Sequence, residues 1–106
     1  MAEKQKYEVV VAIVNEGHAD KVMDAAREAG ARGGTIIHAR GSGTKDIAKK
    51  YNVIITPQKE MLYILVNVNI RDAVISSINK ACGLDTPGQG IVFSLPVNNI
   101  SGLKLE

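Results

Sequence analysis

The chain alternates between continuous apolar runs and segments whose apolar residues follow helical spacing. The first run, residues 7–14 (YEVVVAIV), is rich in β-branched residues and predicts a strand. In the next segment, apolar residues recur at helical spacing with charged residues between them: Val22, Ala25, Ala26 and Ala29. The same plan then repeats. The pattern predicts strands over 7–14, 35–40, 61–68 and 91–97, and helices over 18–30 and 70–82.

Capping residues indicate where the two helices begin and end. Gly30 and Gly83 stand at the expected C-termini, because glycine readily adopts the left-handed conformation that closes a helix. Asn69 is a suitable N-cap for the second helix, and Asp72 is favoured near the positive end of its dipole. The apolar stripe expected on this helix consists of Ala73, Val74, Ile78 and Ala81.

Two successive β-α-β units predict an α+β fold of the ferredoxin-like βαββαβ type. In this fold a four-stranded antiparallel sheet carries two helices on one face, the crossovers are right-handed, and the second and third strands pair antiparallel. The 106 residues are enough for one domain with one core. We therefore expect residues 1–106 to form a single domain.

The strands at 9–14 and 62–66 do not alternate with polar residues, which is typical of strands buried on both faces. Two short helices can cover only one face of a four-stranded sheet. An uncovered second face would exceed the few hundred Å² of apolar patch that is common on monomers. We therefore expect self-association through the sheet; these residues alone leave dimer and trimer open.

Composition and charge narrow the functional classes. The net charge of +2 is too small for the basic face of a nucleic-acid-binding protein, so we expect no nucleic-acid partner. The single cysteine, Cys82, excludes an internal disulfide and fits a reducing compartment. No run approaches the ~20 apolar residues of a membrane span, and the charged N-terminus leads directly into a strand, so we expect a cytoplasmic protein without a signal peptide. His18 and His38 lack ligand partners at metal spacing, and no catalytic constellation is evident, so we expect neither a metal site nor an enzyme.

Two glycine-bearing loops are the candidate functional segments. The connection from 40 to 60 is far longer than a usual hairpin loop, and such loops are more often functional than idle. It opens with residues 41–44 (GSGT), whose backbone N–H groups could hold an anion, or which form a simple turn before a solvated basic loop. The second loop, 86–90 (TPGQG), is either a connector or another anion-binding turn. In this topology both loops can lie at one end of the sheet.

The sequence around these loops resembles the PII signalling protein superfamily. Residues 34–43 (GTIIHARGSG) are similar to the pattern in which a threonine on the second strand precedes an R-G-x-G turn. Residues 88–93 (GQGIVF) resemble the G-D-G-K-I-F segment of that superfamily, and Pro96 and Val97 follow. The resemblance in order and spacing runs from about 7 to 97, and it identifies a PII-like protein that diverges from the nitrogen-regulatory members.

This resemblance implies a regulatory homotrimer with an adenine-nucleotide pocket in each cleft between subunits and no required cofactor. The residues that would form the pocket are Thr35 and the backbone near Leu65 at the adenine; Gly41, Ser42, Gly43 and Thr44 along the pocket wall; and Gly88, Gln89 and Gly90 at the phosphate. The connection at about 41–59 would be an effector loop carrying Lys45, Lys49, Lys50 and Tyr51. Such a loop would dock onto a target protein, for example a membrane transporter or a metabolic enzyme.

The chain also departs from the PII pattern. Ile91 occupies the position of the superfamily's phosphate-binding lysine, and the arginine pair of its C-terminal tail is missing. Lys45 stands in place of the glutamine that helps to hold magnesium and 2-oxoglutarate in that superfamily. Each lost hydrogen bond to a charged group costs about 1.5–3 kcal/mol of ligand affinity. We therefore expect AMP or ADP in preference to ATP with 2-oxoglutarate. An alternative with the same fold is a CutA-like metal-handling or stress-response trimer, although the scarcity of Cys, His and Met ligands argues against it.

Overall fold

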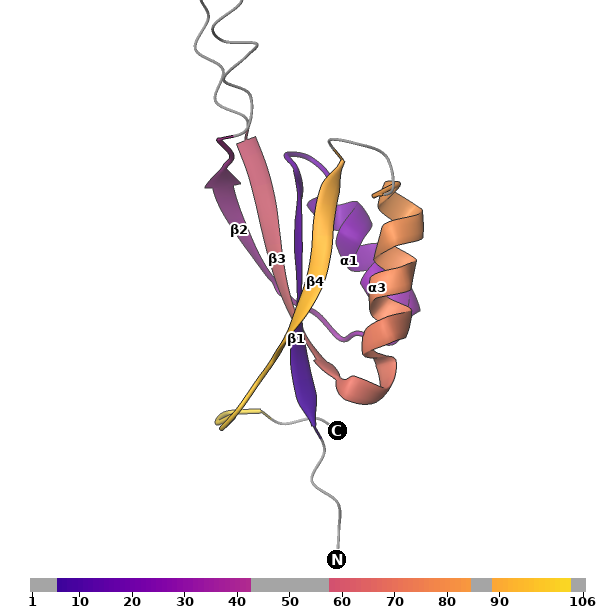
Figure 1. Ribbon diagram of the computed structural model, residues 1–106, viewed down its shortest axis with the longest axis vertical. Helices are drawn as coiled ribbons and strands as arrows, with labels where there is room; N and C mark the ends of the chain where they lie inside the picture. Colours follow the sequence, from indigo (N-terminus) through magenta and orange to yellow (C-terminus); the bar gives the residue numbers. More distant parts are fainter. Residues whose placement is uncertain (1–5, 43–57, 85–88, 104–106) are drawn as a thin grey trace, which may run out of the picture.

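The computed structural model describes residues 6–42, 58–84 and 89–103. Along the chain these form β1 (Tyr7–Asn15), α1 (Ala19–Glu28), β2 (Thr35–Arg40), β3 (Gln58–Asn67), α3 (Val68–Cys82) and β4 (Gly90–Pro96) (Figure 1). This is the predicted βαββαβ order. β2 has the predicted bounds, whereas β3 begins three residues before the expected position 61.

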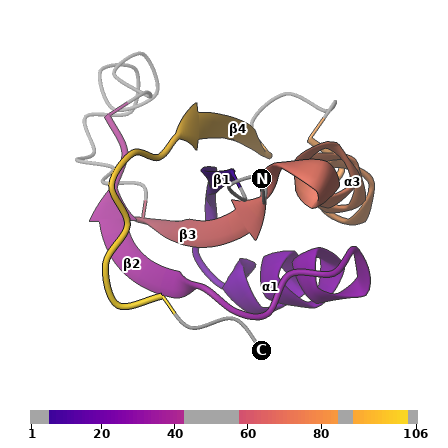
Figure 2. The ribbon, with the colours of Figure 1, turned by 90° about the horizontal axis from the view of Figure 1, so that it is seen from below.

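The four strands form one sheet in the order β2-β3-β1-β4, and every neighbouring pair is antiparallel. β2 and β3 therefore pair with each other across the long connection, as predicted. Both helices lie on the same side of this sheet (Figure 2). The described residues thus confirm the ferredoxin-like fold class.

The start of α3 differs from the prediction. Asn67, not Asn69, is the N-cap: its side-chain oxygen accepts a hydrogen bond of 2.9 Å from the backbone N–H of Asn69. The helix begins two residues early because this side chain satisfies an N–H group of the first turn. Asp72 consequently lies beyond the first turn and pairs with the neighbouring Arg71, at 3.0 Å. The C-terminus is as predicted, with Gly83 in the left-handed conformation (φ 61°).

The core lies between the helices and one face of the sheet. The predicted stripe of α1 is buried at Val22, Ala25 and Ala26. On α3, Val74 and Ile78 are buried as expected, whereas Ala73, which was expected on the same stripe, is exposed. The sheet contributes alternate residues of its central strands: Val10, Ala12, Val14, Leu62, Ile64 and Val66.

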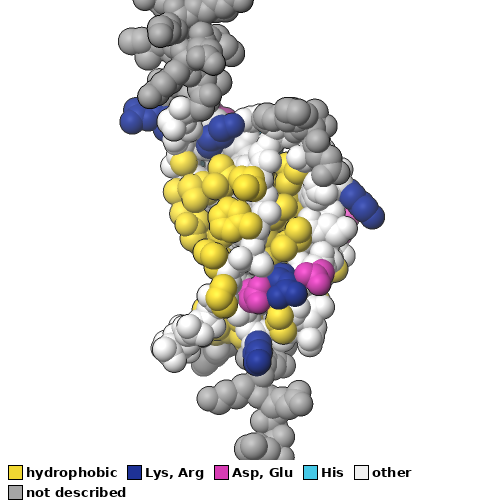
Figure 3. All heavy atoms as spheres, viewed as in Figure 1, with side chains coloured by type: hydrophobic (Ala, Val, Ile, Leu, Met, Phe, Trp, Pro, Cys, Tyr) yellow, Lys and Arg dark blue, Asp and Glu magenta, His cyan; other side chains and the backbone are white. Residues whose placement is uncertain are grey.

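Neither of the two described helices lies over the opposite side of the sheet, which we call the open face. Residues paired across an antiparallel ladder point to the same side, so the register defines its central residues: Val9, Val11, Ile13, Thr35, Ile37, Met61, Tyr63, Leu65, Ile91, Phe93 and Leu95. Tyr7, Asn15, Ala39, Lys59 and Asn67 lie on the same side at the ends of the ladders. Hydrophobic side chains gather over the strands in Figure 3, and several are well exposed, among them Ile91 at 54% and Leu95 at 48%. None of the central residues is charged, and Lys59 lies at one end of this side. The apolar runs that predicted burial on both faces thus leave one face uncovered in a single chain.

Candidate functional site

The described residues of the two predicted glycine turns lie at the same end of the sheet. Gly41 and Ser42 directly follow the last residue of β2, and Gly90 is the first residue of β4. The register places them level with each other. Lys59 on β3 pairs with Ala39 on one side and with Asn15 on the other. Val14, the neighbour of Asn15, pairs with Gly90. β3 and β1 separate the two turns, because β2 and β4 form opposite edges of the sheet. A ligand that contacts both turns must therefore reach across this end of the sheet.

The predicted adenine contacts lie toward the other end. Thr35 is the exposed first residue of β2, and Leu65 follows two residues after its partner, Tyr63. β2 spans six residues, so its ends are about 17 Å apart at about 3.4 Å per residue. This distance exceeds the reach of an AMP molecule from ring to phosphate. A site that uses both predicted groups therefore needs one group from each of two copies of the chain.

An apolar cavity of about 250 Å³ adjoins Leu65. β3 continues beyond the last pair of the β2 ladder, Thr35 with Tyr63, so residues 64–67 extend past the β2 partner. The cavity lies along this extension and is lined by Tyr7, Leu65, Val66, Asn67, Ile70, Leu103 and residues 30–33. Strand backbone beside an apolar wall suits a flat heterocycle, which combines apolar faces with a polar edge. Thr35 does not line this cavity.

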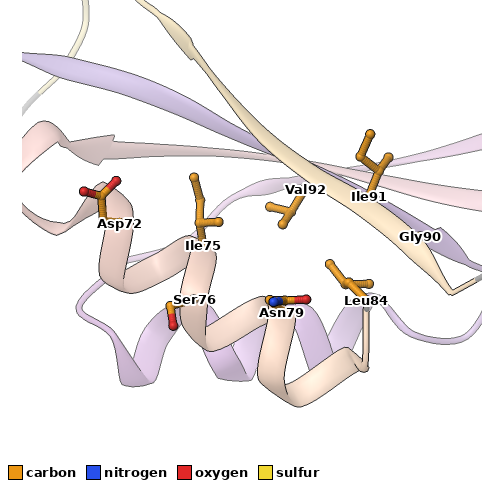
Figure 4. A pocket seen from close by; sticks show the side chains of 8 residues that line it. All are labelled: Asp72, Ile75, Ser76, Asn79, Leu84, Gly90, Ile91 and Val92. Atoms are coloured by element: carbon orange, nitrogen blue, oxygen red, sulfur yellow. The ribbon is translucent and has the colours of Figure 1, made fainter. Parts of the chain in front are cut away.

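A larger cleft of about 480 Å³ lies between α3 and the start of β4 (Figure 4). In Figure 4, Asp72, Ser76 and Asn79 line it from α3, and Val92 faces it from β4, whereas the side chain of Ile91 leaves the opposite side of the strand. Among the described residues, its lining contains one carboxylate and neither lysine nor arginine. An anion is therefore disfavoured there, and phosphate is better placed at the glycine turns.

Gly90 is restricted to glycine by the β1–β4 pairing. Its φ of 139° strains any other residue, and a Cβ there would collide with the carbonyl oxygen of Ile13. A charged substitution at Gly90 would thus disturb the sheet as well as a bound phosphate. Gln89, which is half-buried and precedes the strand, is a better position for testing the loop.

Lys59 is a candidate that the loop pattern alone did not single out. It belongs to β3, pairs with Ala39 just before the Gly41 turn, and points to the same side of the sheet as the open face. Its ammonium donates a 2.6 Å hydrogen bond to the side chain of Asn15. The sequence placed this lysine within the long connection between strands. The strand register places its cation beside the turn that is predicted to bind an anion.

Glu60 is a structural residue at the same end of the sheet that the sequence did not reveal. One carboxylate oxygen accepts hydrogen bonds from the backbone N–H groups of Gly17 (2.8 Å) and Ala19 (3.0 Å), at the start of α1. The only indication in the sequence was indirect, since the N-cap position of α1 is occupied by His18 and not by a usual capping residue. In the structure the His18 side chain makes no capping hydrogen bond. Glu60 is 8% exposed, and its other carboxylate oxygen is 3.8 Å from His38 Nδ1.

These contacts determine the pKa of Glu60. Burial raises the pKa, which is the largest single effect. Hydrogen bonds from the N–H groups of Ala19 and Gly17 lower it, and the charge of His38 and a hydrogen bond from the N–H of His18 lower it further. The net effect is a pKa below the usual value. Glu60 is thus an anionic cap that joins the start of β3 to the start of α1.

Part of the predicted site lies outside the described residues, namely Gly43, Thr44, Lys45, Lys49, Lys50, Tyr51 and Gly88. Their roles stay predictions.

Within the described ranges, no group of three His, Cys, Asp or Glu side chains is arranged to hold a metal ion. Of the helices that the structure describes, none is long and apolar enough to span a membrane. Burial raises the pKa of the Cys82 thiol, with Lys21 opposing this rise, so this cysteine is not an activated nucleophile.

The fold and the glycine turns at one sheet end define a ferredoxin-like domain of the PII type, and comparison with known proteins agrees. The family model described as "Nitrogen regulatory protein P-II" matches residues 7–106. The chain therefore belongs to the P-II family. Among solved structures, it is similar to Arabidopsis thaliana PII bound to citrate, with a TM-score of 0.67 and 26% identity over 89% of this chain and 79% of that chain. A search of curated sequences finds no match.

Proposed function

We propose that this protein is a P-II-type regulator that binds an adenine nucleotide in clefts between copies of the chain and controls a target protein through the connection at about 41–59. Proteins of the P-II family are typically trimers that bind small molecules and regulate other proteins. The observation that carries the proposal is the position of Gly41, Ser42 and Gly90 at one end of a sheet whose open face is uncharged at its centre and has no described helix over it.

The assembly part of the proposal rests on the open face. Interface cores are depleted in charged residues, and the open face has none at its defining positions. The separation of about 17 Å between the two ends of β2 supports clefts between copies, because one copy cannot present both predicted contact groups to one AMP molecule. We infer a homotrimer, in which each cleft combines the turn end of one copy with the Leu65 end of the next.

The ligand preference rests on charge. Near the glycine turns the described cations are Arg40 and Lys59, and Ile91 supplies none although it leaves β4 beside Gly90. Few cations favour a ligand with few phosphates, since each charge-assisted hydrogen bond contributes about 1.5–3 kcal/mol. The proposed ligand is therefore AMP or ADP, in preference to ATP with 2-oxoglutarate.

A thermal-shift series with AMP, ADP, ATP and ATP plus 2-oxoglutarate tests this proposal. A ligand at a hundredfold excess over its Kd stabilises the folded state by about 2.7 kcal/mol, which is a measurable shift. Gln89→Glu should abolish the AMP shift, because it brings a carboxylate to the proposed phosphate loop. Asn79→Asp is the matched control, since it adds the same charge to the neighbouring α3–β4 cleft and should retain the shift.

Two results would contradict the proposal. One is a shift that requires ATP and 2-oxoglutarate together, which would reverse the ligand preference. The other is sedimentation as a single 11.3 kDa chain at the assay concentration, which would remove the clefts.

A further inference from the structure

Tyr63 lies in the middle of the open face. Its partners across the ladders are Thr35 on β2 and Val11 on β1, and Met61 and Leu65 flank it along β3. β3 is an interior strand, yet Tyr63 is 40% exposed, whereas Val11 beside it is only 2% exposed. Side chains beside Val11 therefore cover it, and the Tyr63 phenol forms part of the exposed surface that a covering copy would meet.

The open face offers the Tyr63 hydroxyl no partner of its own. Among the central residues of this face only Thr35 and Tyr63 carry a polar side-chain group; Tyr7, Asn15, Lys59 and Asn67 lie on the same side at the ends of the ladders. The hydroxyl of Thr35 is bonded to its β-carbon, whereas that of Tyr63 is at the far end of a long aromatic side chain. Within the described part of the chain, the Tyr63 hydroxyl makes no hydrogen bond. Water satisfies it in a single copy, and this water is lost when another copy covers the face.

Hydrophobic contact between two uncharged sheets is non-directional, so by itself it selects a relative orientation weakly. A hydrogen bond from a buried hydroxyl is directional, and its absence is costly once water is excluded. We propose that Tyr63 donates a hydrogen bond to the facing copy and so fixes the orientation in which copies of this chain pack. This inference rests on the sheet-to-sheet assembly proposed above, and it assigns to one residue the specificity of that assembly.

Tyr63→Phe tests the inference, because it removes the hydroxyl and keeps the ring and its apolar area. We expect the apparent dissociation midpoint, measured by sedimentation velocity over a dilution series, to rise at least fivefold. Ser94→Ala is the control: it removes a hydroxyl from the helix-covered side of the same sheet, where Ser94 pairs with Val10, and the midpoint should stay within twofold of wild type. Methyl NMR of the assembled Tyr63→Phe protein should show additional or broadened signals from alternative orientations, and far-UV circular dichroism should show unchanged secondary structure.

The outcomes separate this inference from the proposed function. An assembled wild type with an equal or lower midpoint for Tyr63→Phe would overturn the role of Tyr63 and leave the proposed assembly intact. A wild type that is monomeric throughout the dilution series would overturn both.

Discussion

Glu60 provides the sharpest test of how the sheet holds α1. Its carboxylate replaces the capping side chain that His18 does not provide, and it does so from a strand more than forty positions away in sequence. Glu60→Gln keeps the size of the side chain and one acceptor oxygen but removes the negative charge. Glu60→Ala removes the acceptor altogether and leaves the N–H groups of Gly17 and Ala19 without this partner.

The expected loss follows from the two hydrogen bonds. A bond to a charged group contributes about 1.5–3 kcal/mol and a neutral bond about 0.5–1.5 kcal/mol, so removing the charge from two bonds should lower the free energy of unfolding by about 2 kcal/mol. Interaction of the carboxylate with the positive end of α1 contributes in the same direction. Glu60→Ala should cost about 2–4 kcal/mol, because buried N–H groups then lose their acceptor. For a domain of this size the Glu60→Gln loss corresponds to a decrease in Tm of about 8–16 °C.

The effect should depend on pH, with a sign set by the lowered pKa of Glu60. A carboxyl group with a lowered folded-state pKa stabilises the protein at pH values above its usual pKa, here 4.5. This contribution decreases as the pH falls through the lower folded-state pKa. The difference between wild type and Glu60→Gln should therefore be complete at pH 7 and disappear under strongly acidic conditions.

Urea denaturation at pH 7 and at acidic pH, at one fixed protein concentration, measures both effects. Glu16→Gln is the matched control, since Glu16 is an exposed carboxylate in the same turn and makes no bond to α1 in the described structure. If Glu60→Gln were no less stable than Glu16→Gln at pH 7, the capping role would be wrong. It would also be wrong if the loss of unfolding free energy in Glu60→Gln persisted at a pH at which Glu60 of the wild type is protonated.

Two further predictions concern glycine and charge. Gly34→Ala should destabilise the protein by about 1–3 kcal/mol, because a Cβ there meets Ile64 Cγ1 and the Tyr63 carbonyl oxygen, each at 2.9 Å. Gly33→Ala is the control, since a Cβ at Gly33 meets no atom within 4 Å. Equal urea midpoints for the two variants would refute this reasoning. Ile91→Lys should raise the affinity for ATP relative to AMP about tenfold or more, because it adds a cation beside Gly90. Calorimetric titration measures this ratio on protein that sedimentation shows to be assembled, since Ile91 also belongs to the open face; an unchanged ratio in the assembled variant would place the phosphates elsewhere.

The order of elements could be read from the sequence because it depends on local spacing. The β-branched run at 7–14 and the stripe at Val22, Ala25 and Ala26 each fit only one regular structure, and both formed as predicted. The N-cap of α3 was wrong by two residues, since Asn67 and Asn69 are equally suitable by type and only the path of the backbone decides between them. The apolar strands also indicated correctly that the helices leave one face of the sheet without cover.

The long-range arrangement was decided by the tertiary structure. That Glu60 caps α1, that Lys59 lies beside the Gly41 turn and that Tyr63 stands at the middle of the open face all depend on strand register, which pairs residues far apart in sequence. A shift of one residue would move each of these side chains to the other face of the sheet. The sequence by itself therefore determined which strands and helices form, because those are set by neighbours three or four positions away, whereas the site was set by the pairing of strands.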